Sequence, residues 1–461
     1  MRYTDVSHRT WAVPLRLVAL LVSMIVFSPW AWAEEGTGEA PQATGTTAPE
    51  TAPGEATGSA ASEATDAEAG APHADFVSTK NIEDKLREAK APRKSVLDFG
   101  LQDALRRVDD RIYQKTHLRF AAIYTLLYQH AYGGDGPRDA AGGDFDLIGT
   151  WDAIRCGKRT TGALEVAFEG RHKIETDITP SALSRTIDSL WTTTSGFNKQ
   201  DFSLIQAYWR QDLLRDRLHF RVGKLSASST FFGNRINSSS LFFLNYAFSD
   251  NPAVFFPGNG LGLHVTWDLS PRWSITAGVQ NANGIKTEID PSTLRFGEYW
   301  SALQFTYRAR IRGLGEGTYR VGGWYVTPRE IGHTEAGAGG VLSIDQELGK
   351  HVIGFLRYER QGESLVSPDV RFKTLTATRS VVRGGIGVSG LIPGWPDDYI
   401  GVGLAWGDPA DDRAKDSYVA EIFYRSQIER TTQLSLSLQS IQSSTVFDQV
   451  LVLSVRLRFQ F

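Results

Sequence analysis

The C-terminal residues 451–461 alternate without a break between apolar and polar side chains. Leu453 and Phe459 fall on an apolar face, and Arg456 and Arg458 fall on the opposite face. Alternation with a period of two predicts a β-strand. A fully apolar face opposite a charged face is typical of a wall that has lipid on one side and water on the other.

The same alternation recurs through residues 116–461, for example in segments 164–169, 218–223, 261–269 and 303–310. We count about sixteen such segments. An even number of antiparallel strands is the rule for single-chain bacterial outer-membrane barrels. The pattern therefore predicts an all-β fold, a transmembrane antiparallel β-barrel of about sixteen strands.

The connections between these segments alternate in length. Short turns are expected near residues 156, 212, 270, 313, 347, 393 and 426, and long loops near 130–143, 173–200, 226–260, 282–298, 328–338, 362–381, 408–416 and 442–448. Outer-membrane barrels have short periplasmic turns and long outer loops. We therefore expect both ends of the barrel chain on the periplasmic side.

The N-terminal quarter of the chain, residues 1–115, divides into three further segments. Residues 1–33 combine arginines, a short apolar run and a small-x-small site, which predicts a secretory signal peptide. Residues 34–76 are acidic, rich in Ala, Thr, Gly and Pro, and contain no Lys or Arg. Such a composition predicts a disordered linker; a partner-binding role is the alternative.

Residues 77–115 are expected to form a helical periplasmic segment. Leu97, Leu101, Leu105, Val108 and Ile112 recur at spacings that place them on one stripe of a helix. Packing of this helix on the periplasmic end of the barrel is the first interpretation, and an oligomerising coiled coil is the second.

The composition of the chain limits the kinds of binding and chemistry that it can support. The formal charge is -3, and nothing in the charge pattern or motifs supports nucleic-acid binding. Cys156 is the single cysteine, so no intrachain disulfide or cysteine-based metal site can form. We expect no cofactor and no metal. His219 and His264 fall on inward faces but lack a recognisable catalytic partner motif, so a barrel enzyme is the disfavoured alternative.

A barrel of about sixteen strands leaves an aqueous channel, which predicts a pore. The inward positions carry charges of both signs, and a mixed lining suits neutral polar solutes because sugars both donate and accept hydrogen bonds. The alternative for each charge is a salt bridge that stiffens the wall. The candidate lining residues are Arg210, Arg221, Asp268, Arg308, Arg310, Arg357 and Glu359.

The loop over residues 226–260 is unusually long and aromatic for a connection in a compact domain. We expect it to fold into the lumen and narrow it, with aromatic rings that stack on sugars. The alternative is that the rings only pack the loop onto the inner wall. The candidate constriction residues are Phe231, Phe232, Asn234, Arg235, Phe242 and Phe243.

Five stretches resemble the carbohydrate-selective porins of the OprB type: residues 101–120, residues 207–232 with the sequence FRVGK, and residues 397–408, 421–442 and 456–459. The resemblance covers roughly residues 97–461. It implies diffusion of mono- and oligosaccharides through the outer membrane. The acidic linker and a divergent first third depart from the family, so a general diffusion porin without sugar preference stays open.

The resemblance also concerns the chain end and the partners. A final strand that ends on an aromatic residue resembles the signature read by the barrel assembly machinery, which makes Phe461 the expected assembly signal. The expected partners are therefore small solutes, outer-membrane lipid and that machinery. A homotrimer is left open.

Overall fold

The computed structural model describes residues 101–156, 159–330, 334–365, 377–442 and 449–461. The chain divides into two compact units, Met1–Gly70 and Ala71–Phe461, and all described residues belong to the second. The predicted signal peptide, the predicted linker and the predicted helical turns before residue 101 lie outside the described residues.

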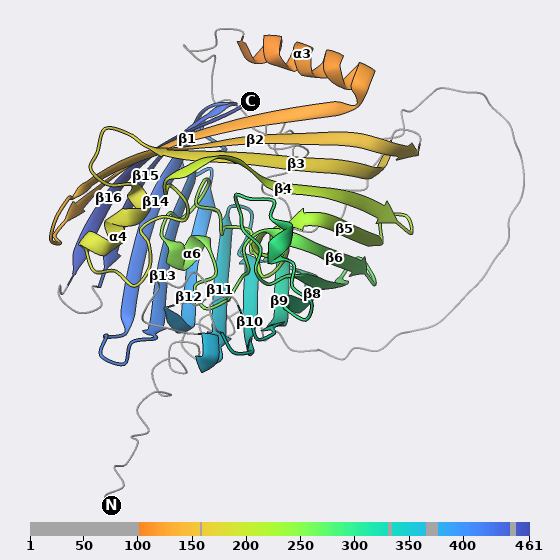
Figure 1. The fold of residues 1–461 in the computed structure, drawn as a ribbon. Coiled ribbons are helices and arrows are strands. Elements are labelled where there is room, and N and C mark those ends of the chain that lie inside the picture. The colour runs from red at the N-terminus through yellow and green to blue at the C-terminus, as the bar shows by residue number, and fades with distance from the viewer. Residues whose placement is uncertain (1–100, 157–158, 331–333, 366–376, 443–448) are drawn as a thin grey trace, which may run out of the picture. The chain divides into compact units, whose positions relative to one another are not determined.

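In this part of the chain, sixteen antiparallel strands form a closed barrel, in which each strand pairs with its neighbours in sequence and β1 pairs with β16 (Figure 1). The predicted fold and strand number are confirmed. The strands are β1 Leu118–Tyr132, β2 Asp139–Cys156, β3 Arg159–Lys173, β4 Gln200–Leu213, β5 Leu218–Leu225, β6 Gly260–Asp268, β7 Trp273–Asn281, β8 Tyr299–Ile311, β9 Gly315–Val326, β10 Gly337–Glu347, β11 Val352–Gln361, β12 Thr378–Ser389, β13 Tyr399–Pro409, β14 Ser417–Glu429, β15 Thr432–Ile441 and β16 Val450–Gln460.

Closure of the barrel depends on the last residues of the chain. The register of β1 against β16 runs from Ile123 opposite Gln460 to Tyr132 opposite Leu451. Beyond this ladder, the Phe461 amide donates to the Ala122 carbonyl at 2.8 Å, and the Ala122 amide donates to the Phe461 carbonyl at 3.0 Å. The terminal residue thus completes the seam and leaves no open strand edge there.

The burial of side chains is the reverse of that in a water-soluble protein. On β16, Leu451 and Leu453 are 41% and 39% exposed, whereas Arg456 and Arg458 are 1% and 4% exposed. The predicted two-faced wall is therefore present, with apolar residues outward and polar residues inward. This arrangement places a multi-pass barrel in lipid, because exposed apolar side chains on nearly all of the described strands would not be stable in water.

The two ends of the barrel differ as predicted, with two corrections. Turns such as 214–217, 269–272 and 312–314 close one end, and loops such as 174–199 and 226–259 extend from the other. The first loop spans only 133–138, because β1 and β2 continue through residues we had expected to form the loop. At the short-turn end, the connection 390–398 is longer than the others.

Helix α3 (Leu101–Thr116) precedes the barrel. The Tyr113 hydroxyl donates to the Asp152 carboxylate at 2.8 Å, and the Arg119 guanidinium lies 3.9 Å from the centre of the Tyr113 ring. These contacts support packing on the end of the barrel, while Val108 remains 51% exposed. None of the described helices is long and apolar enough to cross a membrane.

The wall has a notch between β4 and β5 at the end that carries the long loops. A β-bulge at Ile205 interrupts the pairing of β4 with β3, because Ala167 faces Gln206 while Phe168 faces Leu204. On the other side, pairing of β4 with β5 ends at Ala207 opposite Lys224. Loop segments fill the notch: the Asn259 side-chain amide donates to the Ile205 carbonyl at 2.7 Å.

Candidate functional site

The loop 226–259 crosses the lumen and includes two short helices, α5 (Ala227–Thr230) and α6 (Tyr246–Ser249). Inward side chains of the wall hold its backbone. The Glu421 carboxylate accepts the amides of Leu244 and Asn245 at 2.8 and 2.9 Å. The Arg456 guanidinium donates to the Phe242 carbonyl at 3.1 Å. Wall carboxylates thus bind loop amides, and wall arginines bind loop carbonyls.

Arg357, Glu359 and Arg383 form the innermost part of this attachment, and all three are fully buried. The Glu359 carboxylate lies 2.8 Å from Arg357 and 2.6 Å from Arg383, and it accepts the Ala253 amide at 3.1 Å. Both arginines also bind the side chain of Asn251 in the loop. The sequence-predicted Arg357 and Glu359 therefore fasten the loop and have no contact with open lumen.

The loop aromatics pack onto the inner wall. Phe231 is fully buried, with its ring centre 5.1 Å from that of His264 and 5.5 Å from that of Trp300. Phe232 is 1% exposed, and its amide donates to the Gln304 side chain. Phe243 is fully buried in a second aromatic cluster. None of these three rings presents a face to a passing solute.

The remaining candidate residues of the loop, Asn234, Arg235 and Phe242, also contact neighbouring residues. The Asn234 side chain accepts the Ile236 amide, which forms a local turn. Arg235 pairs with Asp345 and, at 2.9 Å, with Glu347 on β10. Phe242 lies against Tyr399, with ring centres 5.2 Å apart.

The loop 174–199, which contains η1 (Pro180–Ala182) and α4 (Leu183–Thr186), also bends inward. The Trp191 indole donates to the Thr378 hydroxyl on β12 at 3.0 Å, and the Tyr246 amide donates to the Thr192 carbonyl at 3.0 Å. Its apolar residues join Phe243 and Phe248 in one cluster against β11–β16 and β1. The two loops thus fill that side of the lumen.

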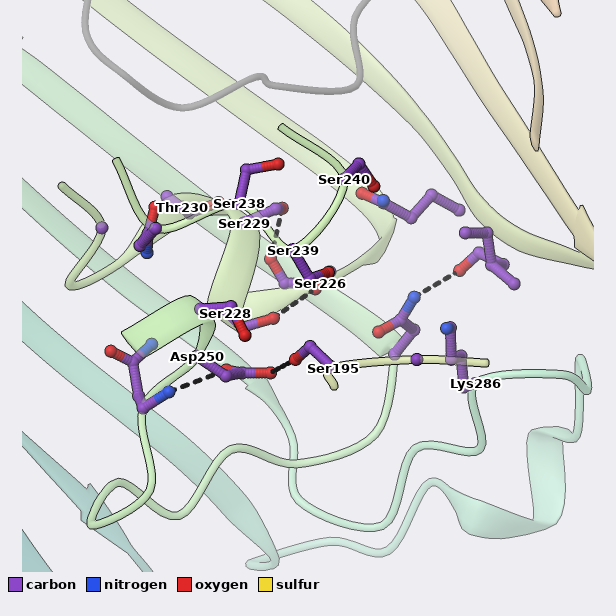
Figure 2. Close-up of a pocket in the computed structure, with 18 of the residues that line it drawn as sticks. Ser195, Ser226, Ser228, Ser229, Thr230, Ser238, Ser239, Ser240, Asp250 and Lys286 are labelled. Atoms are coloured by element: carbon purple, nitrogen blue, oxygen red, sulfur yellow. Dashed lines mark hydrogen bonds between the residues drawn. The ribbon is translucent and has the colours of Figure 1, made fainter. Parts of the chain in front are cut away.

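A cavity of about 440 Å³ remains on the other side, between the loop 226–259 and the wall from β2 to β9 (Figure 2). Its lining is dominated by hydroxyl groups. The hydroxyl-bearing residues of the lining are Ser195, Ser226, Ser228, Ser229, Thr230, Ser238, Ser239, Ser240, Ser249, Thr266, Ser274, Thr276 and Thr306. Such groups both donate and accept hydrogen bonds without carrying charge.

A compact charged group lies on one wall of this cavity. Asp144 and Asp146 on β2 and Glu169 on β3 place carboxylate oxygens within 4.8 Å of one another. The Arg171 guanidinium lies 2.9 Å from Asp144 and also pairs with Glu169, and the Lys286 ammonium pairs with Glu169. Two cations of the chain thus already oppose the acidic cluster.

The other predicted wall residues form ion pairs along the inner surface. Arg210 lies 2.8 Å from Glu165 and 2.6 Å from Asp212, and Arg308 lies 3.6 Å from Asp268. The Arg221 guanidinium lies 5.7 Å from the centre of the Tyr208 ring. The side chain of Arg310 is 82% exposed at the short-turn end, 3.7 Å from Glu316. Of the predicted set, Arg308 lines the cavity.

Sequence reasoning missed the serine-rich face, Arg171 and Lys286. The runs SASS at 226–229 and SSS at 238–240 are visible in the sequence of the loop. The prediction for this loop was based instead on its aromatic residues. Asp144 and Asp146 alternate in the manner of inward residues of a strand, and this signal could have identified them. Nothing in the sequence shows that Lys286, in a different loop, reaches the same cavity.

Comparison with known proteins decides the family. The profile of the carbohydrate-selective porin, OprB family, matches residues 163–461. The chain belongs to this family. No curated protein matches the sequence. The porin has the fold of Pseudomonas putida OprB: the high-pH structure aligns with a TM-score of 0.62 at 15% identity, covering 77% of this chain and 97% of that one. The low-pH structure aligns with a TM-score of 0.52 at 14% identity, covering 81% and 100%.

The porin is an outer-membrane channel and not an enzyme, as predicted. Some of its lumen charges, such as Glu359, Arg383 and Glu421, hold the loop 226–259. The cavity that remains is lined largely by hydroxyl groups.

Proposed function

We propose that this porin passes sugars and other small neutral polar solutes by diffusion through the hydroxyl-lined cavity. The lining itself carries the proposal, because hydroxyls can exchange hydrogen bonds with a sugar at every orientation. The lining charges are also balanced: Asp144, Asp146, Glu169 and Asp250 are opposed by Arg171, Lys286, Arg308 and Arg320. A lining without excess charge of one sign provides little basis for selecting ions.

The partners follow from the same architecture. We propose that Phe461 presents the signal for the barrel assembly machinery, since its backbone closes the seam of the barrel. Outer-membrane lipid covers the outward apolar faces. A homotrimer is a further hypothesis, which cross-linking in native membranes would test.

The serine face offers a direct test. The triple variant Ser238→Ala, Ser239→Ala and Ser240→Ala should weaken glucose block of ion current by about ten-fold, because three lost hydrogen bonds at about 0.5 kcal/mol each sum to about 1.5 kcal/mol. Salt conductance should change little. Ser301→Ala, on the lipid-facing side of β8, is the matched control. Equal swelling rates of liposomes in sugars and in amino acids of the same size would instead favour the general diffusion porin.

A further inference from the structure

The loop 282–298, which contains η2 (Pro291–Thr293), joins β7 to β8 and covers the notch between β4 and β5. Lys224, at the end of β5, holds it there. The Lys224 ammonium donates to the carbonyls of Leu204, Lys286 and Glu288 at 2.9, 2.8 and 2.7 Å. An ammonium has three protons to donate, so these three carbonyls use all of them.

The side chain of Lys286 points from this loop into the cavity (Figure 2). Its ammonium pairs with Glu169, which is 5% exposed on the inner face of β3. Lys224 binds the carbonyl of Lys286 itself. The backbone position from which the Lys286 side chain starts is thus fixed to the wall.

Lys286 differs from the other cations of the cavity. Arg171, Arg308 and Arg320 are borne on strands of the barrel, and Lys286 alone among the cavity's cations comes from a loop. Without Lys286, the acidic cluster Asp144, Asp146 and Glu169 would be opposed by Arg171 only, within the described lining. The cavity would then carry one unit of excess negative charge.

We propose that Lys286 determines the charge selectivity of the channel, and that Lys224 is its positioning residue. Lys286 keeps the lining balanced, so that neither anions nor cations are favoured. Loss of its charge converts the path into a cation-preferring one. The inference depends on the barrel being a channel and not on which neutral solute it passes.

The test is the reversal potential of purified full-length porin in planar bilayers under a KCl gradient. Lys286→Gln should shift the reversal potential toward the potassium equilibrium potential. We expect the ratio of potassium to chloride permeability to rise a few-fold, the order expected for a unit charge at ~4 Å from a permeating ion in water. Lys286→Arg should behave as wild type. Lys199→Gln, an exposed loop lysine outside the cavity lining, is the matched control.

Chemical restoration separates charge from shape. In a Cys156→Ser background, Lys286→Cys should prefer cations, and a positively charged methanethiosulfonate should return the reversal potential to the wild-type value. A negatively charged reagent should shift it further toward potassium. If Lys286→Gln folds as a heat-modifiable barrel and its reversal potential equals that of wild type, the proposal is overturned. Absence of sugar block in a porin whose Lys286→Gln variant still shifts the reversal potential would bear on the proposed solute alone.

Lys224→Met tests the positioning role. It should shift the reversal potential in the same direction as Lys286→Gln, because the loop that carries Lys286 loses its attachment. The double variant should match Lys286→Gln and show no further shift. If the Lys224→Met porin is less heat-stable but has the wild-type reversal potential, Lys224 has a structural role only.

Discussion

At the scale of single residues, the position of a charge along a strand predicted its direction but not its partner. Arg357 and Glu359 were expected on the inner face from alternation alone, and they lie there. Their function in this structure is to bind the loop 226–259, about a hundred residues earlier in sequence. Such a partnership follows from the path of the loop, which periodicity does not encode. The same limit explains why Phe231 and Phe232 were predicted to face solute.

Asp250 is one residue of the cavity lining through which pH should act on the channel. Its side chain lines the cavity and accepts hydrogen bonds from Ser195 at 3.2 Å and from the Asn251 amide at 2.9 Å. Burial raises the pKa of the Asp250 carboxyl, although both hydrogen bonds and Arg383 act in the opposite direction.

A raised pKa means that Asp250 stays neutral to higher pH than a free aspartate and gains its charge as pH rises through that value. We therefore expect cation preference to increase with pH across this range, measured as the reversal potential in a KCl gradient. Asp250→Asn should remove that part of the slope. An unchanged slope in Asp250→Asn would assign the effect to other carboxylates of the lining.

At the scale of elements, strands were the most predictable part of the molecule. The alternation in residues 451–461 identified β16 because lipid and water impose opposite demands on its two faces. Local irregularities in strand pairing were not visible in the sequence. The bulge at Ile205 makes the pairing of β4 with β3 irregular, and the alternation of Ile205, Ala207 and Trp209 does not reveal it. The first loop was overestimated because small residues such as Gly142 and Gly143 are compatible with both a loop and a strand.

The seam between β1 and β16 yields a prediction for Phe461. Deleting it removes both backbone hydrogen bonds to Ala122 together with the aromatic chain end. We expect the deletion to accumulate as a protease-sensitive product without the heat-modifiable shift of a folded barrel on gels. Phe461→Tyr, which keeps the backbone bonds and an aromatic ring, is the control and should assemble. Normal assembly of the deletion variant would contradict the proposed role.

At the scale of the whole molecule, the difference in length between the two sets of connections predicted the topology, and Cys156 provides a probe for it. This residue is exposed at the end of β2 on the short-turn side. A membrane-impermeant maleimide should leave Cys156 unlabelled on intact cells and label it after the outer membrane is opened. Ser292→Cys in a Cys156→Ser background, placed in the loop 282–298, should be labelled on intact cells. The reverse pattern would invert the orientation.

The barrel wall and the inward loops are held by different kinds of bonds. The strands close on one another through backbone hydrogen bonds, whereas the loops inside are attached through side chains such as Arg383, Glu359 and Glu421. The stability of the barrel and the width of its channel can therefore change independently during evolution. Bacterial lineages exposed to a new nutrient or a new toxin can change which solutes enter the cell through substitutions in the inward loops. The residues needed for export and membrane insertion of the barrel can stay the same.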